Sequence, residues 1–85
     1  MTIRLSTEYS ENELAFLKKH NCGILSEIKL PKSCEAPARM FTYCGAYIGE
    51  IEDEEGTVWA VLSKFGGKYH WGECYGDLKA LEDGF

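Results

Sequence analysis

Hydrophobic and polar positions in the second half of the chain follow the pattern of β-strands. Residues 57–65, Thr-Val-Trp-Ala-Val-Leu-Ser-Lys-Phe, are rich in the β-branched and aromatic side chains that strands favour. The pair Gly66-Gly67 is typical of a two-residue hairpin loop, so residues 68–75 are expected to return as the next strand. Residues 40–51 are also mainly apolar, and Gly45 and Gly49 within them predict a single, strongly twisted strand.

An acidic turn joins residues 40–51 to residues 57–65. Its sequence is Glu52-Asp53-Glu54-Glu55-Gly56, and Gly56 can adopt the positive φ that a G1-bulge hairpin requires. The second half of the chain is therefore expected to form an antiparallel meander of three strands.

The first half of the chain carries a clear helix signal. Ser10 and Glu13 have the spacing of a capping box, in which each side chain accepts a hydrogen bond from the other residue's backbone N–H. Basic residues end the segment, as the helix dipole favours, so we expect a helix from Glu11 to His20. Its apolar face consists of Leu14, Phe16 and Leu17.

Shorter elements surround this helix and the meander. Residues 23–30 alternate as a strand does, and Pro31 ends them. Residues 31–38 contain both prolines and are expected to form a loop. Asp77 is placed to cap a short final turn over residues 78–82.

These elements predict a single α+β domain over residues 1–85. One N-terminal helix is expected to pack on one face of a three- to four-stranded antiparallel meander, because both elements have apolar surface to bury. We expect Leu14 and Leu17 to face Val58, Ala60 or Leu62. The hydrophobic content of 45% and the aromatic content of 13% support a packed fold, because disordered chains lack such residues.

The charge of the chain restricts the partners it can have. Fourteen acidic and nine basic residues give a net charge of −5, and the basic residues are scattered. Nucleic acids and anionic membranes require clustered Lys and Arg, so we expect direct binding to neither. A protein with a basic surface is the better electrostatic match.

The N-terminal residues and the cysteines predict a cytoplasmic protein. Residues 1–8 lack the apolar run of a signal peptide, and no segment approaches the ~20 apolar residues of a membrane span. In the reducing cytoplasm, free thiols are favoured over disulfides at Cys22, Cys34, Cys44 and Cys74.

Motifs for cofactors and catalysis are weak in this sequence. The cysteines lie 12, 10 and 30 positions apart, whereas zinc sites favour close pairs such as C-x₂-C. Gly66-Gly67-Lys68 lacks the spacing and the hydroxyl of a phosphate-binding loop. We therefore expect no enzyme activity, no cofactor and no metal. The alternative hypothesis is a small metal-binding or hydrolytic domain that uses His70, Cys74 and nearby acidic residues.

The acidic turn carries the main functional hypothesis. Its carboxylates either form a solvated loop or act as an electrostatic docking site that imitates the phosphates of a nucleic acid. Tyr and Trp are enriched at protein interfaces, so Trp71 of the last strand is included. The predicted partner-binding residues are Glu50, Glu52, Asp53, Glu54, Glu55 and Trp71.

The sequence thus suggests a small acidic binding protein without enzyme activity. By analogy of size and charge, it would be an inhibitor of the phage anti-defence or bacterial immunity type. In that role it would occupy the basic, nucleic-acid-binding surface of a partner protein.

Overall fold

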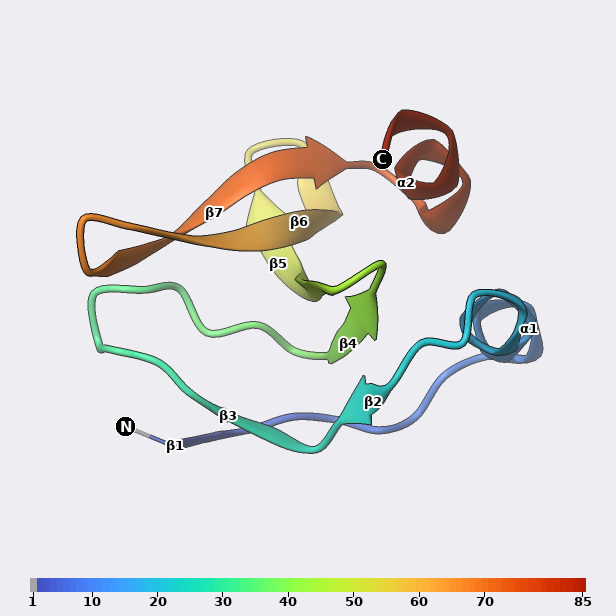
Figure 1. The fold of residues 1–85 in the computed structure, drawn as a ribbon, viewed down its shortest axis with the longest axis horizontal. Helices are drawn as coiled ribbons and strands as arrows, with labels where there is room; N and C mark the ends of the chain where they lie inside the picture. Colours follow the sequence, from blue (N-terminus) through green and yellow to red (C-terminus); the bar gives the residue numbers. More distant parts are fainter. Residues whose placement is uncertain (1) are drawn as a thin grey trace.

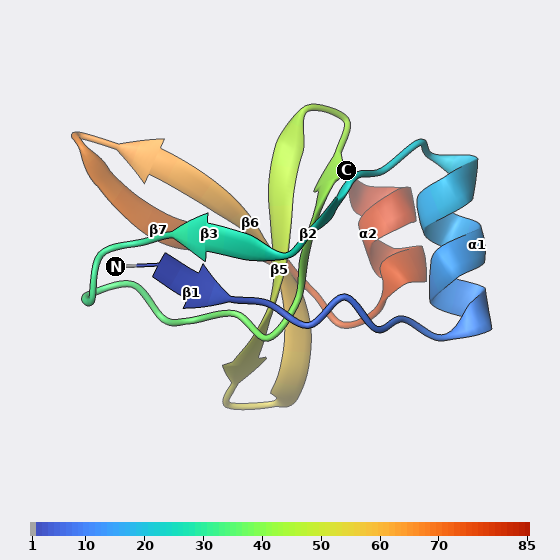
Figure 2. The same cartoon turned by 90° about the horizontal axis from the view of Figure 1, so that it is seen from below.

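A five-stranded antiparallel sheet forms the centre of the molecule, and two helices lie side by side at one end of it (Figure 1, Figure 2). This computed structural model describes residues 2–85. The sheet has the order β2-β4-β5-β6-β7, and a separate two-stranded sheet pairs β1 with β3. The strands are β1 (Thr2–Arg4), β2 (Ile24–Leu25), β3 (Glu27–Lys29), β4 (Met40–Tyr43), β5 (Ala46–Asp53), β6 (Gly56–Phe65) and β7 (Lys68–Tyr75), and the helices are α1 (Glu11–Lys19) and α2 (Leu78–Gly84).

The predicted helix is confirmed, together with its capping box. The backbone N–H of Ser10 donates to Oε1 of Glu13 at 2.8 Å, and the N–H of Glu13 donates to Oγ of Ser10 at 3.3 Å. The helix ends at Lys19, with His20 as its C-cap, and Asn21 then takes a left-handed φ of 54°. Local sequence therefore defines both ends of α1.

The fold class α+β is confirmed, but the prediction of a single helix is wrong. The segment after Asp77 is a helix of seven residues, not one turn. The Asp77 side chain accepts a hydrogen bond from the N–H of Ala80 at 2.8 Å, and Leu81 is completely buried. Packing of Leu81 on the core stabilises a helix too short to persist by itself.

The sheet is larger than predicted because residues 40–51 form two strands. The chain reverses at Cys44 and Gly45, both with positive φ, so β4 and β5 pair as a hairpin. The prediction that residues 40–51 form one twisted strand is therefore wrong. A cysteine with positive φ is rare, and the pattern around it gave no turn signal.

Residues 23–30 also depart from the prediction of one continuous strand. They divide at Ser26 into β2, which pairs with β4, and β3, which pairs with β1. The carbonyl of Ser26 accepts a hydrogen bond from the N–H of Leu5 at 2.9 Å. The change of partner depends on segments distant in sequence, so the alternation of residues 23–30 does not predict it.

The remaining strands and turns follow the sequence closely. β6 and β7 have nearly the predicted bounds, and Gly66 and Gly67 join them with φ values of 60° and 80°. Gly56 has the expected positive φ, at 112°. β5 extends to Asp53, which pairs with Gly56, so the acidic turn itself contains only Glu54 and Glu55.

The core consists of two apolar clusters, because successive residues of a strand point to opposite faces. The larger cluster contains Leu17, Phe41, Tyr43, Ile48, Trp59 and Leu81. The smaller cluster contains Ile51, Val58 and Ala60, with Trp71 packed against it. α1 therefore packs on the face of Trp59. The prediction that it faces Val58, Ala60 or Leu62 is wrong, and Leu14 remains 45% exposed.

No helix within residues 2–85 is long and apolar enough to cross a membrane.

Candidate functional site

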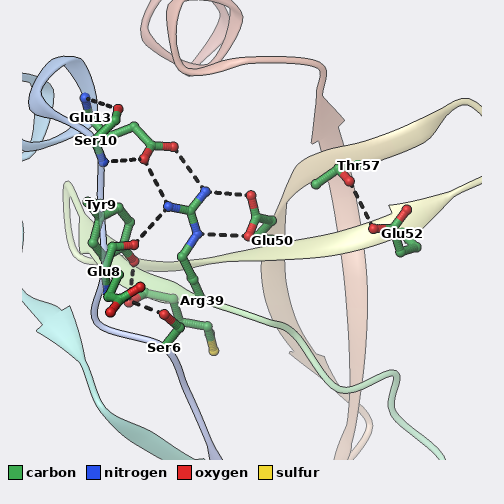
Figure 3. A network of polar contacts seen from close by, with 10 residues as sticks. Ser6, Glu8, Tyr9, Ser10, Glu13, Arg39, Glu50, Glu52 and Thr57 are labelled. Atoms are coloured by element: carbon green, nitrogen blue, oxygen red, sulfur yellow. Dashed lines mark hydrogen bonds and ion pairs between the residues drawn. The ribbon is translucent and has the colours of Figure 1, made fainter.

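Arg39 joins three segments of the chain at the base of the β5–β6 hairpin (Figure 3). Its guanidinium donates to both carboxylate oxygens of Glu13 on α1, at 2.9 and 3.0 Å. It also donates to both oxygens of Glu50 on β5, at 2.8 and 2.6 Å. A fifth hydrogen bond, at 3.0 Å, goes to the carbonyl of Glu8. All five N–H donors of the guanidinium are thus used within the chain.

Two aromatic rings enclose the same guanidinium. The Cζ atom of Arg39 lies 4.7 Å from the centre of the Tyr9 ring and 5.3 Å from the centre of the Trp59 ring. Burial raises the pKa of Tyr9 to about 12, although the positive charge of Arg39 acts in the opposite direction. The hydrogen bonds from Arg39 lower the pKa of Glu13, and those to Glu50 and Glu13 raise the pKa of Arg39. At neutral pH Glu13 and Arg39 are therefore charged and Tyr9 is neutral. Their contacts connect the base of the hairpin to α1.

Two of the predicted partner-binding residues have structural roles. Glu50 is engaged by Arg39, and its side chain is only 16% exposed. Trp71 is half-buried, and its indole N–H donates to the carbonyl of Glu35 at 2.9 Å. Its ring lies over Gly49, so Trp71 holds the 31–38 loop against the sheet.

The other four predicted residues form an exposed surface, here called the acidic tip: Glu52, Asp53, Glu54 and Glu55. Within residues 2–85, no Lys, Arg or His forms an ion pair with any of them. Glu52 accepts a hydrogen bond from the Thr57 hydroxyl at 2.8 Å (Figure 3). The carboxylate of Glu35 accepts one from the N–H of Glu52 at 3.1 Å, which adds another negative charge beside the tip.

A cleft of about 570 Å³ opens between the two helices and the sheet. Phe16, Trp59 and Leu78 supply apolar surface, and the carboxylates of Glu13, Glu50, Asp77 and Glu82 also line it. Glu82 is held by Lys19 at 3.2 Å and by His20 at 2.6 Å, and the hydrogen bond from His20 lowers its pKa. The cleft therefore combines an aromatic floor with oxygens that can accept hydrogen bonds.

His70 and Cys74, the residues of the alternative hypothesis, both lie exposed on β7. Four positions along a strand span about 13 Å, too far for both side chains to bind one metal ion directly. Within residues 2–85, no group of three or more His, Cys, Asp or Glu residues is arranged to hold a metal ion. All four cysteines are free thiols, and burial raises the pKa of Cys74.

Sequence reasoning missed the Arg39 cluster altogether. The sequence pattern indicates only a capping role for Glu13, and it gives no role to Tyr9 or Arg39. The two carboxylates lie 26 and 11 positions from Arg39. The only sequence signal for this cluster is a single arginine directly after the predicted loop of residues 31–38. Because an exposed arginine can have the same context, this signal does not identify a partly buried ion pair.

Comparisons of the chain with protein-family models, with curated proteins and with solved structures found no match.

Proposed function

We propose that this chain is a small binding protein without enzyme activity, which occupies a basic surface of a partner protein through its acidic tip. The observation that carries the proposal is that four exposed carboxylates without ion-pair partners within residues 2–85 lie together on one hairpin. Glu13, Glu50 and Glu82, in contrast, form ion pairs with basic residues of the chain itself. The four tip carboxylates have no such partners within residues 2–85 and are exposed to solvent.

The architecture around the tip supports this function. Arg39 fixes Glu50, three residues before Asp53, to α1 and to the carbonyl of Glu8. A charged surface held on a rigid base loses less conformational entropy on binding than a flexible loop does. The tip is thus preorganised for a partner whose surface is basic.

Nucleic-acid-binding proteins are the partner class that fits this chemistry. Carboxylates along a hairpin can take the place of phosphates in a basic groove, and they also steer the encounter over long range. Bound in this way, the chain would act as an inhibitor, as anti-defence and immunity proteins do.

Affinity capture with a matched pair of variants tests the proposal. The tip variant carries Glu52→Gln, Asp53→Asn, Glu54→Gln and Glu55→Gln. The control variant carries Glu8→Gln, Glu11→Gln, Glu27→Gln and Asp83→Asn, four exposed positions elsewhere, and so has the same net charge. Equal unfolding midpoints in urea would show that both variants are folded.

We expect the control variant to retain the proteins captured by the unmodified chain and the tip variant to lose them. The purified partner should then bind more weakly as salt increases, because salt screens exposed charges. A double-stranded oligonucleotide should compete for the same surface. Equal capture by the tip and control variants would contradict the proposal.

A further inference from the structure

The outer edge of β7 is open. β7 is the last strand of the five-stranded sheet, and Figure 1 shows it at the border of the molecule. Within residues 2–85 its only pairing partner is β6. An edge strand of eight residues presents a row of unpaired N–H and C=O groups, to which another strand can bind.

The two ends of β7 carry opposite charges. At the β6–β7 turn, Lys64, Lys68 and His70 are exposed, and Phe65 between them is 78% exposed. The other end carries Glu73 and, just beyond the strand, Asp77, both exposed. An apolar side chain and basic groups thus lie at one end, and acidic groups at the other.

The acidic end of β7 also leads into the cleft. Gly76, Asp77 and Leu78 follow the strand directly and line the cleft of about 570 Å³ whose floor is formed by Phe16 and Trp59. The aromatic floor of this cleft matches, in chemistry, the exposed ring of Phe65 beside the opposite end of β7.

We propose that two copies of the chain pair antiparallel along β7, each placing Phe65 and its lysines at the cleft of the other. The register that sets His70 opposite Glu73 of the second copy also sets Lys68 opposite Tyr75. The Gly66-Gly67 turn then faces Gly76 and Asp77. The strand pairing would join two five-stranded sheets into one sheet of ten strands.

Charge favours a second copy as the occupant of this edge. A two-fold axis places each basic end beside an acidic end, and every favourable contact occurs twice. Parallel pairing, in contrast, would bring like charges together. In the antiparallel arrangement Lys68 lies diagonal to Glu73, within the distance at which cross-strand charges attract.

A β-bulge interrupts β7 near its middle. Trp71 pairs with Leu62 and Cys74 with Ala60, so Gly72 and Glu73 together lie opposite Val61 alone. Bulges bend a strand and break its ladder of hydrogen bonds locally. The two charged ends of β7 must therefore supply most of the contact, which makes their side chains the ones to change.

Sedimentation velocity over a range of protein concentrations tests the dimer at physiological salt. Phe65→Ser and Lys68→Glu change exposed side chains, so neither should lower the stability of the monomer. We expect each to weaken dimerisation about tenfold, since each contact is lost twice and Lys68→Glu also introduces repulsion from Glu73. Lys18→Glu, an exposed change on α1 with the same net charge as Lys68→Glu, should have no effect.

Combining Lys68→Glu with Glu73→Lys restores the opposite charges and should restore the dimer. A monomer at millimolar concentration would overturn the proposal, and so would an equal effect of Lys18→Glu and Lys68→Glu. None of these variants alters the acidic tip, so failure of the dimer leaves the test of the proposed function unaffected.

Discussion

Gly49 lies beneath the indole ring of Trp71 in the middle of β5. A Cβ atom at this position would approach Cη2 of Trp71 to 2.5 Å and Cβ of Pro37 to 3.2 Å. The absence of a side chain therefore lets one aromatic ring close the sheet face and hold the 31–38 loop. The requirement is steric: it comes from the neighbours of the glycine and not from its backbone angles.

Gly49→Ala should lower the free energy of unfolding by about 1–3 kcal/mol, the usual cost of overpacking a filled site. Urea denaturation monitored by circular dichroism measures this loss. In a Trp71→Phe background the same change should cost less, because the smaller ring leaves room for the methyl group. An equal cost in both backgrounds would show that the indole ring is not the cause.

Arg39 illustrates a different property at the residue scale. Its planar guanidinium matches two carboxylates at once, and the remaining N–H reaches a backbone carbonyl. A lysine could not reproduce this geometry, because its ammonium group is a point charge with three donors. One residue thus connects α1, β5 and the segment that precedes α1.

At the scale of elements, α1 shows how a helix with a weak apolar face is oriented. Leu17 is 3% exposed within the larger cluster, and Leu14 is 45% exposed. Phe16 packs at the border of that cluster and lies 4.6 Å from the ring of His20, measured between ring centres. The helix therefore contributes one central leucine to the core instead of two.

Leu17→Ala should cost about 2–5 kcal/mol of unfolding free energy, because a buried leucine leaves a cavity when it is truncated. Leu14→Ala is the matched control: it removes the same atoms from the same helix, and its cost should be small. Parallel urea titrations of the two variants provide the comparison. Similar losses for the two would mean that α1 is rotated relative to the structure.

At the scale of the whole molecule, ionisable groups link the stability of the fold to pH. The pKa of Glu13 is lower in the folded chain than its ordinary value of 4.5, so its contribution to stability is present above 4.5 and is lost as pH falls through the lowered value. The pKa of Tyr9 is raised from 10.0 to about 12. Its contribution is therefore present below 10.0 and is lost as pH rises toward about 12.

We therefore expect the free energy of unfolding to be highest between these two ranges and to fall on both sides. Glu13→Gln should reduce the loss on the acidic side and leave the alkaline side unchanged. Tyr9→Phe should do the reverse, although burial also raises the pKa of Tyr43, which keeps part of the alkaline loss. Urea midpoints across pH measure both effects. Unchanged pH profiles in these variants would contradict the assignment.

The sequence alone determined the features that depend on neighbouring residues. The capping box of α1, the glycine turn between β6 and β7, the alternation along β6 and the charge of the acidic tip were all visible in it. Each is set by backbone preferences or side chains within a few positions. For this reason the α+β class is confirmed, and the four residues of the acidic tip are exposed, as expected of a charged turn.

Only the tertiary structure decided which distant segments meet. It divided residues 23–30 between two sheets, reversed the chain at Cys44, stabilised α2 through Leu81 and brought Glu13 and Glu50 to Arg39. Glu50 belongs to the same acidic run as the tip, yet its position opposite Arg39 makes it part of the scaffold. The physical reason is that burial and ion pairing depend on distance in space, which the spacing of residues along a chain does not specify.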